Sequence, residues 1–555
     1  MSFYERFIQP LVNSQHTDEN SGSDKKAPLA QAHTNKRQPS QREQRLTRAT
    51  LIGASAFGVA SALVIVVNGI LPNIFSPASQ SASVPALGYT FPDTGASSRS
   101  GSSSKSNHCD GKGATASLDC LLKPEARIAN QCQIGGNELS AADMEVARIA
   151  WKYFENNYNE STGLVNSVHA YPSTTMWDTG SAIAAFIAAK DFGFITQKEF
   201  DDATSKLISS LRRMELFEGK APNKVYHTHS LEMVDYGNNP VEGGIGVSVL
   251  DLARLISWMN TLQCMHPKYA HSSNKALSRW DYTDLIHNEE MYGMARDPLS
   301  GEVLILQEGR LGYEQYAGKI FDRVGFSVET AKDYENKHRA DTNILGTDIA
   351  YDSRDPRIYH ANNYVVTESY AMDAMELGVD KINSELMQNI FDVQKKRWQE
   401  TGIVTAISED NINQDPWFLY NTIFNAGIAF NTITETGVQH DHLKAVSTKA
   451  AISMALLYPE DEYSQVLLST VESAYDEDLG WYSGVYENGG YNDVTTANTN
   501  GVILSGLLHK KYGTIFEHCD KCAGRLNIES DVKKAPVEDS NATAALTCES
   551  CELDD

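Results

Sequence analysis

Apolar residues recur at helical spacing between Glu138 and Gly513, where two classes of segment alternate. Segments such as SELMQNIFDVQKKRW, STKAAISMALLY and YSQVLLSTVESAY predict amphipathic helices with one face in solvent. Segments of the second class run from a loop rich in glycine, asparagine, threonine or aromatic residues into a helix of small residues, which predicts helices buried on both sides. Ser140, and Thr196 with Glu199, are typical helix-capping residues.

The second class of segment occurs six times, at intervals of about 50 to 75 residues, which indicates an internal repeat. The six loop-to-helix junctions begin at Thr174, Val241, Gly312, Val365, Phe418 and Val494. Six buried helices alternating with six amphipathic ones predict an all-α fold, an (α/α)6 toroid whose six variable loops converge on one mouth. The alternative is an irregular helical domain.

A different pattern precedes this domain. Residues 1–48 are polar, basic and without strong periodicity, and predict a disordered cytoplasmic segment. Residues 49–70 carry no charge and are long enough for a single N-terminal transmembrane helix. The basic residues on its N-terminal side predict a cytoplasmic N-terminus. A cleaved signal peptide is the alternative, but the long polar lead and the long apolar run favour an uncleaved anchor.

Residues 71–137 include a stretch rich in serine, glycine and proline, typical of a flexible tether, and residues 514–555 form an acidic tail. Every cysteine follows the predicted span, which favours disulfides in an extracytoplasmic domain. The CDKC and CESC pairs near the C-terminus leave a four-thiolate zinc site as the alternative. The eight cysteines are Cys109, Cys120, Cys132, Cys264, Cys519, Cys522, Cys548 and Cys551.

The net charge and the absence of certain motifs argue against several classes of function. A formal charge of −25 argues against nucleic acid as a partner and, more weakly, against a polyanionic substrate. No nucleotide-binding fingerprint or GxSxG nucleophile motif occurs, so no cofactor is expected. His227 and His229 have a spacing compatible with a metal, but no HExxH or equivalent motif accompanies them, so no metal site is predicted.

Six motifs within residues 174–513 also carry a family resemblance. They are, in order, EGRLGYEQYAG, VVTESYAMDAMELG, TGIVTAISEDNINQDPWFLYNT, STKAA, GWYSGVYENGG and ANTNGVIL. Together they resemble a bacterial envelope family of unassigned, glucoamylase-like toroid domains, close to the inverting (α/α)6 glycoside hydrolases. The resemblance implies carbohydrate chemistry at the toroid mouth. Ser505 and Ser369 stand where that family often has a glutamate and a proline, so no catalytic residue is expected in the last repeat.

Glycoside hydrolysis commonly uses two carboxyl groups, one to protonate the leaving oxygen and one to activate water or attack. Glu368 and Asp178 lie at the fourth and first junctions, which face each other in a six-membered ring. Apolar neighbours predict a raised pKa for Glu368, the expected general acid. Asp178, in a threonine-rich loop, is expected to stay ionised as the base. Glu314, between two tyrosines, is the third catalytic candidate.

The remaining candidates would bind the sugar. Aromatic rings stack on pyranose faces and acidic side chains accept bonds from hydroxyls. Core packing is the alternative for the aromatic residues, a calcium ion or loop solvation for Glu409 and Asp410, and a turn for Glu487, whereas Asp178 has a helix N-cap as its alternative. The predicted substrate-binding residues are Trp177, Tyr313, Tyr316, Tyr370, Glu409, Asp410, Trp417, Trp481 and Glu487.

The sequence therefore predicts a membrane-anchored, extracytoplasmic glycoside hydrolase acting on a neutral polysaccharide. The resemblance favours a β-glucan. It would sit in the inner membrane with its main domain periplasmic or extracellular, near envelope polysaccharide machinery. A non-catalytic polysaccharide-binding or export component is the main alternative. A polysaccharide lyase is a third hypothesis, because a toroid does not fix the reaction. A lyase acting on uronates should show a Tyr/His pair with an Arg or Lys neutraliser, which the acidic, aromatic loops fit poorly.

Overall fold

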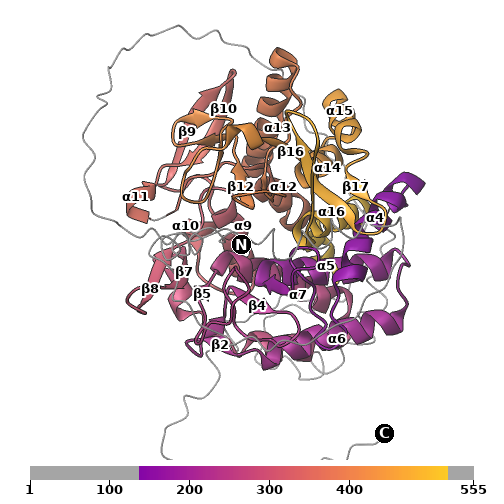
Figure 1. Ribbon diagram of the computed structural model, residues 1–555, viewed down its shortest axis with the longest axis vertical. Helices are drawn as coiled ribbons and strands as arrows, with labels where there is room; N and C mark the ends of the chain where they lie inside the picture. The colour runs from indigo at the N-terminus through magenta and orange to yellow at the C-terminus, as the bar shows by residue number, and fades with distance from the viewer. Residues whose placement is uncertain (1–136, 360, 523–555) are drawn as a thin grey trace, which may run out of the picture. The chain divides into compact units, whose positions relative to one another are not determined.

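The computed structural model describes residues 137–359 and 361–522, all within the second of the chain's two units, residues 53–555. Six helices form an inner ring in this region (Figure 1). Each contacts the next along the chain, and the last contacts the first, so the ring closes. The inner helices are α5 (Met176–Asp191), α7 (Val249–Met265), α9 (Tyr313–Arg323), α12 (Thr367–Met372), α14 (Thr448–Leu457) and α16 (Ala497–Tyr512).

Outer helices separate the inner ones along the chain. In α6 the buried residues follow one stripe, whereas α5 is buried on all sides from Met176 to Ala189, so the two predicted classes of helix are present. Capping boxes begin α4 at Ser140 and α6 at Thr196, as predicted. The outer helices are α4 (Ala141–Asn157), α6 (Gln197–Arg213), α8 (Ala270–Leu277), α10 (Glu329–Lys332), α13 (Lys381–Thr401) and α15 (Glu462–Val471).

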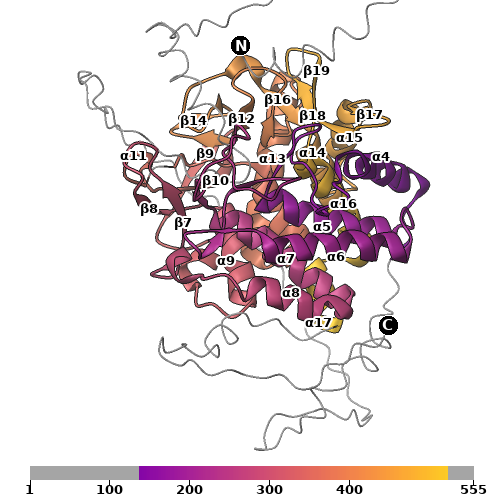
Figure 2. The same ribbon diagram turned by 60° about the horizontal axis from the view of Figure 1, so that its bottom comes forward.

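The fold is a toroid but not all-α, because the connections between helices form small antiparallel sheets of two to four strands (Figure 2). These strands lie in segments for which the sequence pattern predicted loops. The sheets pair β1 (Ser173–Thr175) with β4 (Val225–His227), β2 (Leu216–Phe217) with β3 (Ala221–Pro222), β9 (Arg339–Ile344) with β10 (Thr347–Asp352) and β13 (Phe424–Asn425) with β14 (Ile428–Ala429). The larger sheets join β5 (Gly246–Val247), β6 (Ile286–His287), β7 (Glu290–Arg296) and β8 (Val303–Gln307); β11 (Glu409–Asn411), β12 (Phe418–Asn421) and β15 (Thr432–Ile433); and β16 (Ala445–Ser447), β17 (Tyr475–Asp476), β18 (Gly480–Tyr486) and β19 (Tyr491–Thr495).

The fifth predicted junction is wrong. The segment FLYNTIFNAGIAF forms strands β12, β13 and β14, because Ala426 and Gly427 both have positive φ and close a tight hairpin between β13 and β14. The fifth inner helix is α14, from the segment STKAAISMALLY, which its pattern assigned to the outer layer. Its residues from Thr448 to Ala455 are buried, so the lone charge in it, Lys449, lies inside the domain.

Beyond the predicted boundary at Gly513, helix α17 (Ile515–Cys522) packs against α7, and a disulfide joins Cys519 to Cys264. Cys519 of the CDKC pair is therefore bonded to a cysteine of the second inner helix, and not to zinc or to a cysteine of its own C-terminal segment. A short helix α11 (Pro356–Tyr359) completes the helices of residues 137–522. The other predicted cysteine positions lie outside the residues whose side chains the structure describes.

None of the helices in the described part of the chain is long and apolar enough to cross a bilayer. The predicted span at residues 49–70, the cytoplasmic segment 1–48 and the tether up to residue 136 lie outside the described residues.

Candidate active site

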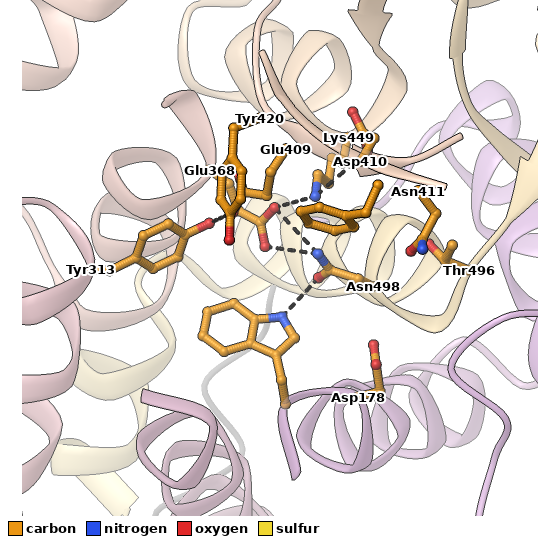
Figure 3. A pocket seen from close by; sticks show the side chains of 12 residues that line it. Asp178, Tyr313, Glu368, Glu409, Asp410, Asn411, Tyr420, Lys449, Thr496 and Asn498 are labelled. Carbon is orange, nitrogen blue, oxygen red and sulfur yellow. Dashed lines mark hydrogen bonds and ion pairs between the residues drawn. The ribbon is translucent and has the colours of Figure 1, made fainter. Parts of the chain in front are cut away.

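The N-terminal ends of five inner helices meet at one pocket with an empty volume of about 440 Å³ (Figure 3). Helices α5, α9, α12, α14 and α16 each contribute side chains from their first turn, and strands β11 and β12 contribute the rest. Loop-to-helix junctions on different repeats therefore converge, as the repeat pattern predicts. The lining residues are Trp177, Asp178, Tyr313, Glu368, Glu409, Asp410, Asn411, Phe418, Tyr420, Lys449, Thr496 and Asn498.

Asp178 is held by the residue that starts its helix. Strand β1 pairs with β4 and ends at Thr175, whose hydroxyl caps α5 by accepting from the backbone N–H of Asp178 at 3.1 Å. The same hydroxyl donates to Asp178 Oδ2 at 2.9 Å. Asp178 is thus a first-turn residue facing the pocket, and the capping role that its sequence also allowed belongs to Thr175.

Glu368, in the first turn of α12, is surrounded by hydrogen-bond donors. Asn498 Nδ2 donates to Glu368 Oε1 at 3.0 Å and lies 3.3 Å from Oε2, and Lys449 forms an ion pair with the same carboxyl group. The indole Nε1 of Trp177 donates to Asn498 Oδ1 at 3.0 Å. Because an indole N–H is only a donor, it fixes the Asn498 amide with its NH₂ group toward Glu368. Glu368 is thus held between an amide and an ammonium group.

Lys449 is the cation of the pocket. It is 2% exposed, pairs with Glu368 and lies 3.6 Å from Asp410 Oδ1. Burial alone would lower the pKa of Lys449, but the neighbouring charges of Glu368, Asp410 and Glu409 outweigh it and raise the pKa. Lys449 therefore stays charged and neutralises the carboxylate nearest to it.

Three other carboxyl groups have raised pKa values. Burial raises the pKa of Asp178 to about 6, although its hydroxyl partners and the charges of Arg254 and Lys449 oppose the shift. Burial raises the pKa of Asp410 to about 7 against the attraction of Lys449, and it also raises the pKa of Glu409. The pocket thus contains three carboxyl groups whose pKa values are raised by burial, beside Glu368, which pairs with Lys449.

Aromatic side chains complete the walls. The hydroxyl of Tyr313, at the start of α9, donates to Glu409 Oε1 across the pocket, and Ser408 Oγ donates to the other oxygen at 2.8 Å. Tyr420 stacks on Tyr364 at 3.6 Å between ring centroids, which fixes β12 against the chain that leads into α12. Trp177 lies edge-on to Tyr313, with ring centroids 5.7 Å apart.

The structure does not bring Glu314 into the pocket. Its carboxyl group accepts from the backbone N–H of Met291 and from Gln307 Nε2, both at 3.1 Å, and forms an ion pair with Arg354. Strand β7 and the chain next to β10 supply these partners, so Glu314 ties two inserted sheets to α9. Its role is structural in the described geometry.

Five predicted sugar-binding residues also lie elsewhere. Tyr316 donates to Glu376 at 2.7 Å inside the helix ring, and Tyr370 stacks on Tyr334 with centroids 5.8 Å apart. Glu487 pairs with Arg397 at 2.6 Å. The remaining two are Trp417, half-buried with a carbonyl that accepts from Ile412, and Trp481, whose indole donates to the Val146 carbonyl.

Six lining residues were not predicted. Lys449 had a recognisable sequence signal, because it is the sole charged residue in an otherwise small and apolar helix and such a lysine is rarely buried without a partner. Asn498 stands in the motif ANTNGVIL, but nothing local to it indicates a pocket. The others are Asn411, Phe418, Tyr420 and Thr496.

The surroundings of the two main carboxyl groups differ from those that the sequence predicts. Glu368 was expected to hold a proton and Asp178 to stay ionised. Lys449 and Asn498 instead offer Glu368 only donors, and burial raises the pKa of Asp178. The apolar residues next to Glu368 in sequence matter less than partners brought in by α14 and α16.

A family model described as "Protein of unknown function (DUF3131)" matches residues 145–513. No curated protein matches the chain. Among solved structures, a candidate glucoamylase from Bacteroides caccae is similar with a TM-score of 0.52 and 14% identity, covering 68% of this chain and 95% of that one. The endo-β-1,2-glucanase of Chitinophaga pinensis, solved with sophorotriose and glucose, has a TM-score of 0.51 and 12% identity over 70% and 99% of the chains.

A third similar structure is the endo-β-1,2-glucanase of Talaromyces funiculosus with sophorose, with a TM-score of 0.50 and 12% identity over 72% of this chain and 88% of that one. At these identities the likeness concerns the fold. It confirms the glucoamylase-like toroid and the resemblance to an unassigned glucoamylase-like family.

Proposed function

This chain belongs to the DUF3131 family, and we propose that it is a glycoside hydrolase that cuts a neutral glucan by inversion. The observation that carries the proposal is the presence, within one pocket, of two carboxyl groups in different surroundings: Glu368 forms an ion pair with Lys449, and Asp178 is a buried carboxyl group of raised pKa. Hydrolysis of a glycosidic bond requires one protonated and one ionised carboxyl group at once.

In the proposed reaction Asp178 is the general acid and Glu368 the general base. Asp178 gives its proton to the glycosidic oxygen as the bond to the anomeric carbon breaks. Glu368 takes a proton from water as the water oxygen attacks that carbon from the opposite face. One bond forms, one breaks, and both carboxyl groups then exchange protons with solvent to restore the starting state.

Asp410 and Glu409 are assigned to substrate hydroxyls. Asp410 shares Lys449 with Glu368 and therefore lies on the same side of the pocket as the proposed base, which disfavours it as the partner acid. Glu409 already accepts from two hydroxyl groups, and these hold its carboxyl group in place.

The charge of the pocket supports a neutral substrate. Among the described residues that line it, four carry carboxyl groups, and the one cation, Lys449, is engaged by Glu368. A uronate would find no free cation among these side chains, which argues against a lyase. A β-glucan is favoured because the similar structures include enzymes described as endo-β-1,2-glucanases.

We also propose that the domain works outside the cytoplasm, anchored by residues 49–70. The Cys264–Cys519 disulfide supports an oxidising compartment, and the uncharged stretch after a basic segment supports the anchor. A reporter enzyme fused after residue 106 should be active when it requires export. Activity that requires the cytoplasm would exclude this topology.

The test of the function is incubation of the purified protein with linear α- and β-glucans, followed by product sizing and proton NMR of the newly formed anomers. We expect cleavage of a β-glucan with the α-anomer appearing first. Initial release of the β-anomer would refute inversion. Tight binding without cleavage of any glucan would refute hydrolysis and favour a polysaccharide-binding or export role.

Two variants test the assigned roles. Glu368→Ala should lose turnover and recover part of it with added azide, because a small anion can occupy the space of the base. Asp178→Asn should keep more activity on aryl glycosides with acidic leaving groups, which need little protonation. The reverse pattern would exchange the two assignments.

A further inference from the structure

The pocket is covered by the strand pair β11 and β12. Five of its lining residues come from these strands and face the ends of the inner helices, as the close view of Glu409, Asp410 and Tyr420 above Asp178 illustrates (Figure 3). The open mouth expected from six loops is therefore narrowed by an insertion between α13 and α14.

Polar contacts attach this cover on several sides. Tyr313 donates to Glu409 from α9, and Lys449 approaches Asp410 from α14 at 3.6 Å. Toward α16, Asn492 Nδ2 donates to the Asn411 carbonyl at 2.6 Å, and Asn413 Nδ2 donates to Asp493 Oδ1 at 2.8 Å. A sugar chain running through the pocket would have to break one of these attachments.

Burial of the lining residues indicates where the pocket opens. Three of the twelve are half-buried, Asn411, Phe418 and Asn498, whereas the other nine are buried. Asp178, at 2% exposed, and Glu368, also at 2%, belong to the closed part.

We propose that the site accepts the end of a glucan chain through the opening beside Asn411, Phe418 and Asn498, and releases a mono- or disaccharide. This inference rests on the proposed hydrolase function and adds the part of the substrate that the site recognises, the end of the glucan chain. A groove crossing the ring would admit the middle of a polymer, whereas a pocket closed behind the carboxyl groups excludes it.

The test compares linear β-1,2-glucan with cyclic β-1,2-glucan, which has no ends, using the full-length protein. We expect the linear glucan to release mono- or disaccharide from the earliest time points, with no ladder of intermediate sizes, and the cyclic glucan to remain intact. Early intermediate sizes, or cleavage of the cyclic glucan at a similar rate, would overturn the inference while leaving the hydrolase function standing.

A binding measurement separates the two proposals when no cleavage occurs. Calorimetric titration of Glu368→Gln with sophorose-type oligosaccharides and with cyclic glucan does not depend on turnover. Binding of the oligosaccharides but not of the cyclic glucan supports recognition of chain ends. It does so even if the wild type cleaves no glucan, a result that would refute the hydrolase function. Equal binding of the cyclic glucan, or no binding of either probe, overturns the inference.

Discussion

Glu368 and Glu314 occupy the same position in two repeats of the ring, but one lines the pocket and the other does not. Each is the second residue of an inner helix, each is at most 2% exposed, and each pairs with a buried cation. Glu314 is surrounded by backbone, Gln307 and Arg354, and its side chain ties sheets together. Glu368 is bonded by Lys449 and Asn498 and lines the pocket.

The difference lies in which elements supply the donors. For Glu314 the partners come from inserted strands that fill the space above its helix, so no cavity remains beside it. For Glu368 the partners come from the first turns of two other inner helices, α14 and α16, whose ends leave open space between them. Helix position alone thus does not distinguish a catalytic carboxyl group from a structural one.

The largest effect is expected for Glu368→Gln. The variant keeps the shape of the side chain and loses the base, so turnover should fall by about 10²- to 10⁴-fold while substrate binding is largely retained. Initial rates and calorimetric binding of the same glucan measure the two quantities. Wild-type turnover in this variant would remove Glu368 from the mechanism.

Glu314→Gln is the matched change in the structural site. The amide would remove one of the two carboxylates that face the buried Arg354, which keeps its ion pair with Asp352, so the free energy of unfolding should fall by about 1 to 3 kcal/mol. Thermal unfolding should show a lower midpoint, whereas turnover at 25 °C should change little. A fall in turnover equal to that of Glu368→Gln would abolish the contrast between the two sites.

Asp410→Asn tests the raised pKa of a pocket acid. Its pKa lies at about 7 in the folded protein, above the ordinary value of 3.8, so the folded protein binds more protons than the unfolded chain in that interval. The free energy of unfolding should therefore fall as pH rises from about 4 to about 7. At pH 8 the variant should be more stable by at most about 4 kcal/mol, since a shift of about 3 pKa units at about 1.4 kcal/mol each sets the upper bound.

Urea unfolding of wild type and Asp410→Asn at pH 4 and pH 8 measures this difference. Asp478→Asn, at an exposed position, is the control and should show no such dependence. Equal stability of wild type and Asp410→Asn at both pH values would mean that Asp410 titrates normally.

The smallest effect is expected for Trp177→Phe, which removes the indole N–H that orients Asn498. With its amide free to turn, Asn498 no longer donates reliably to Glu368, so the proposed base is held less firmly in position. The loss of one hydrogen bond, about 1 kcal/mol, predicts a several-fold lower kcat in initial-rate measurements. Trp481→Phe, whose indole donates to the Val146 carbonyl instead, should leave kcat unchanged.

The sequence predicted the architecture well because buried helices of small residues differ clearly from amphipathic ones. It failed at the fifth repeat, where Lys449 gave α14 an amphipathic appearance and the residues after Phe418 imitated a buried helix while forming strands. Half of the lining residues were among the predicted site residues. Of these, Asp178, Tyr313 and Glu368 lie in the first turns of inner helices, at the junctions that the repeat pattern indicated.

The protonation states were beyond such an analysis. They depend on partners far away in the chain, such as Asn498, which lies 130 residues from Glu368. Whether a junction glutamate faces a cavity likewise depends on inserted strands. The sequence around Glu314 does not show that β7 and Arg354 will fill the space beside it.

The Cys264–Cys519 disulfide makes residues 264–519 one covalent loop, which contains every lining residue of the pocket except Trp177 and Asp178. A protease that cut an exposed turn within it, such as the one at Leu299, which is 79% exposed, would produce two fragments that stay joined. They would separate in electrophoresis only after reduction. A nicked toroid would therefore keep its pocket residues on one molecule.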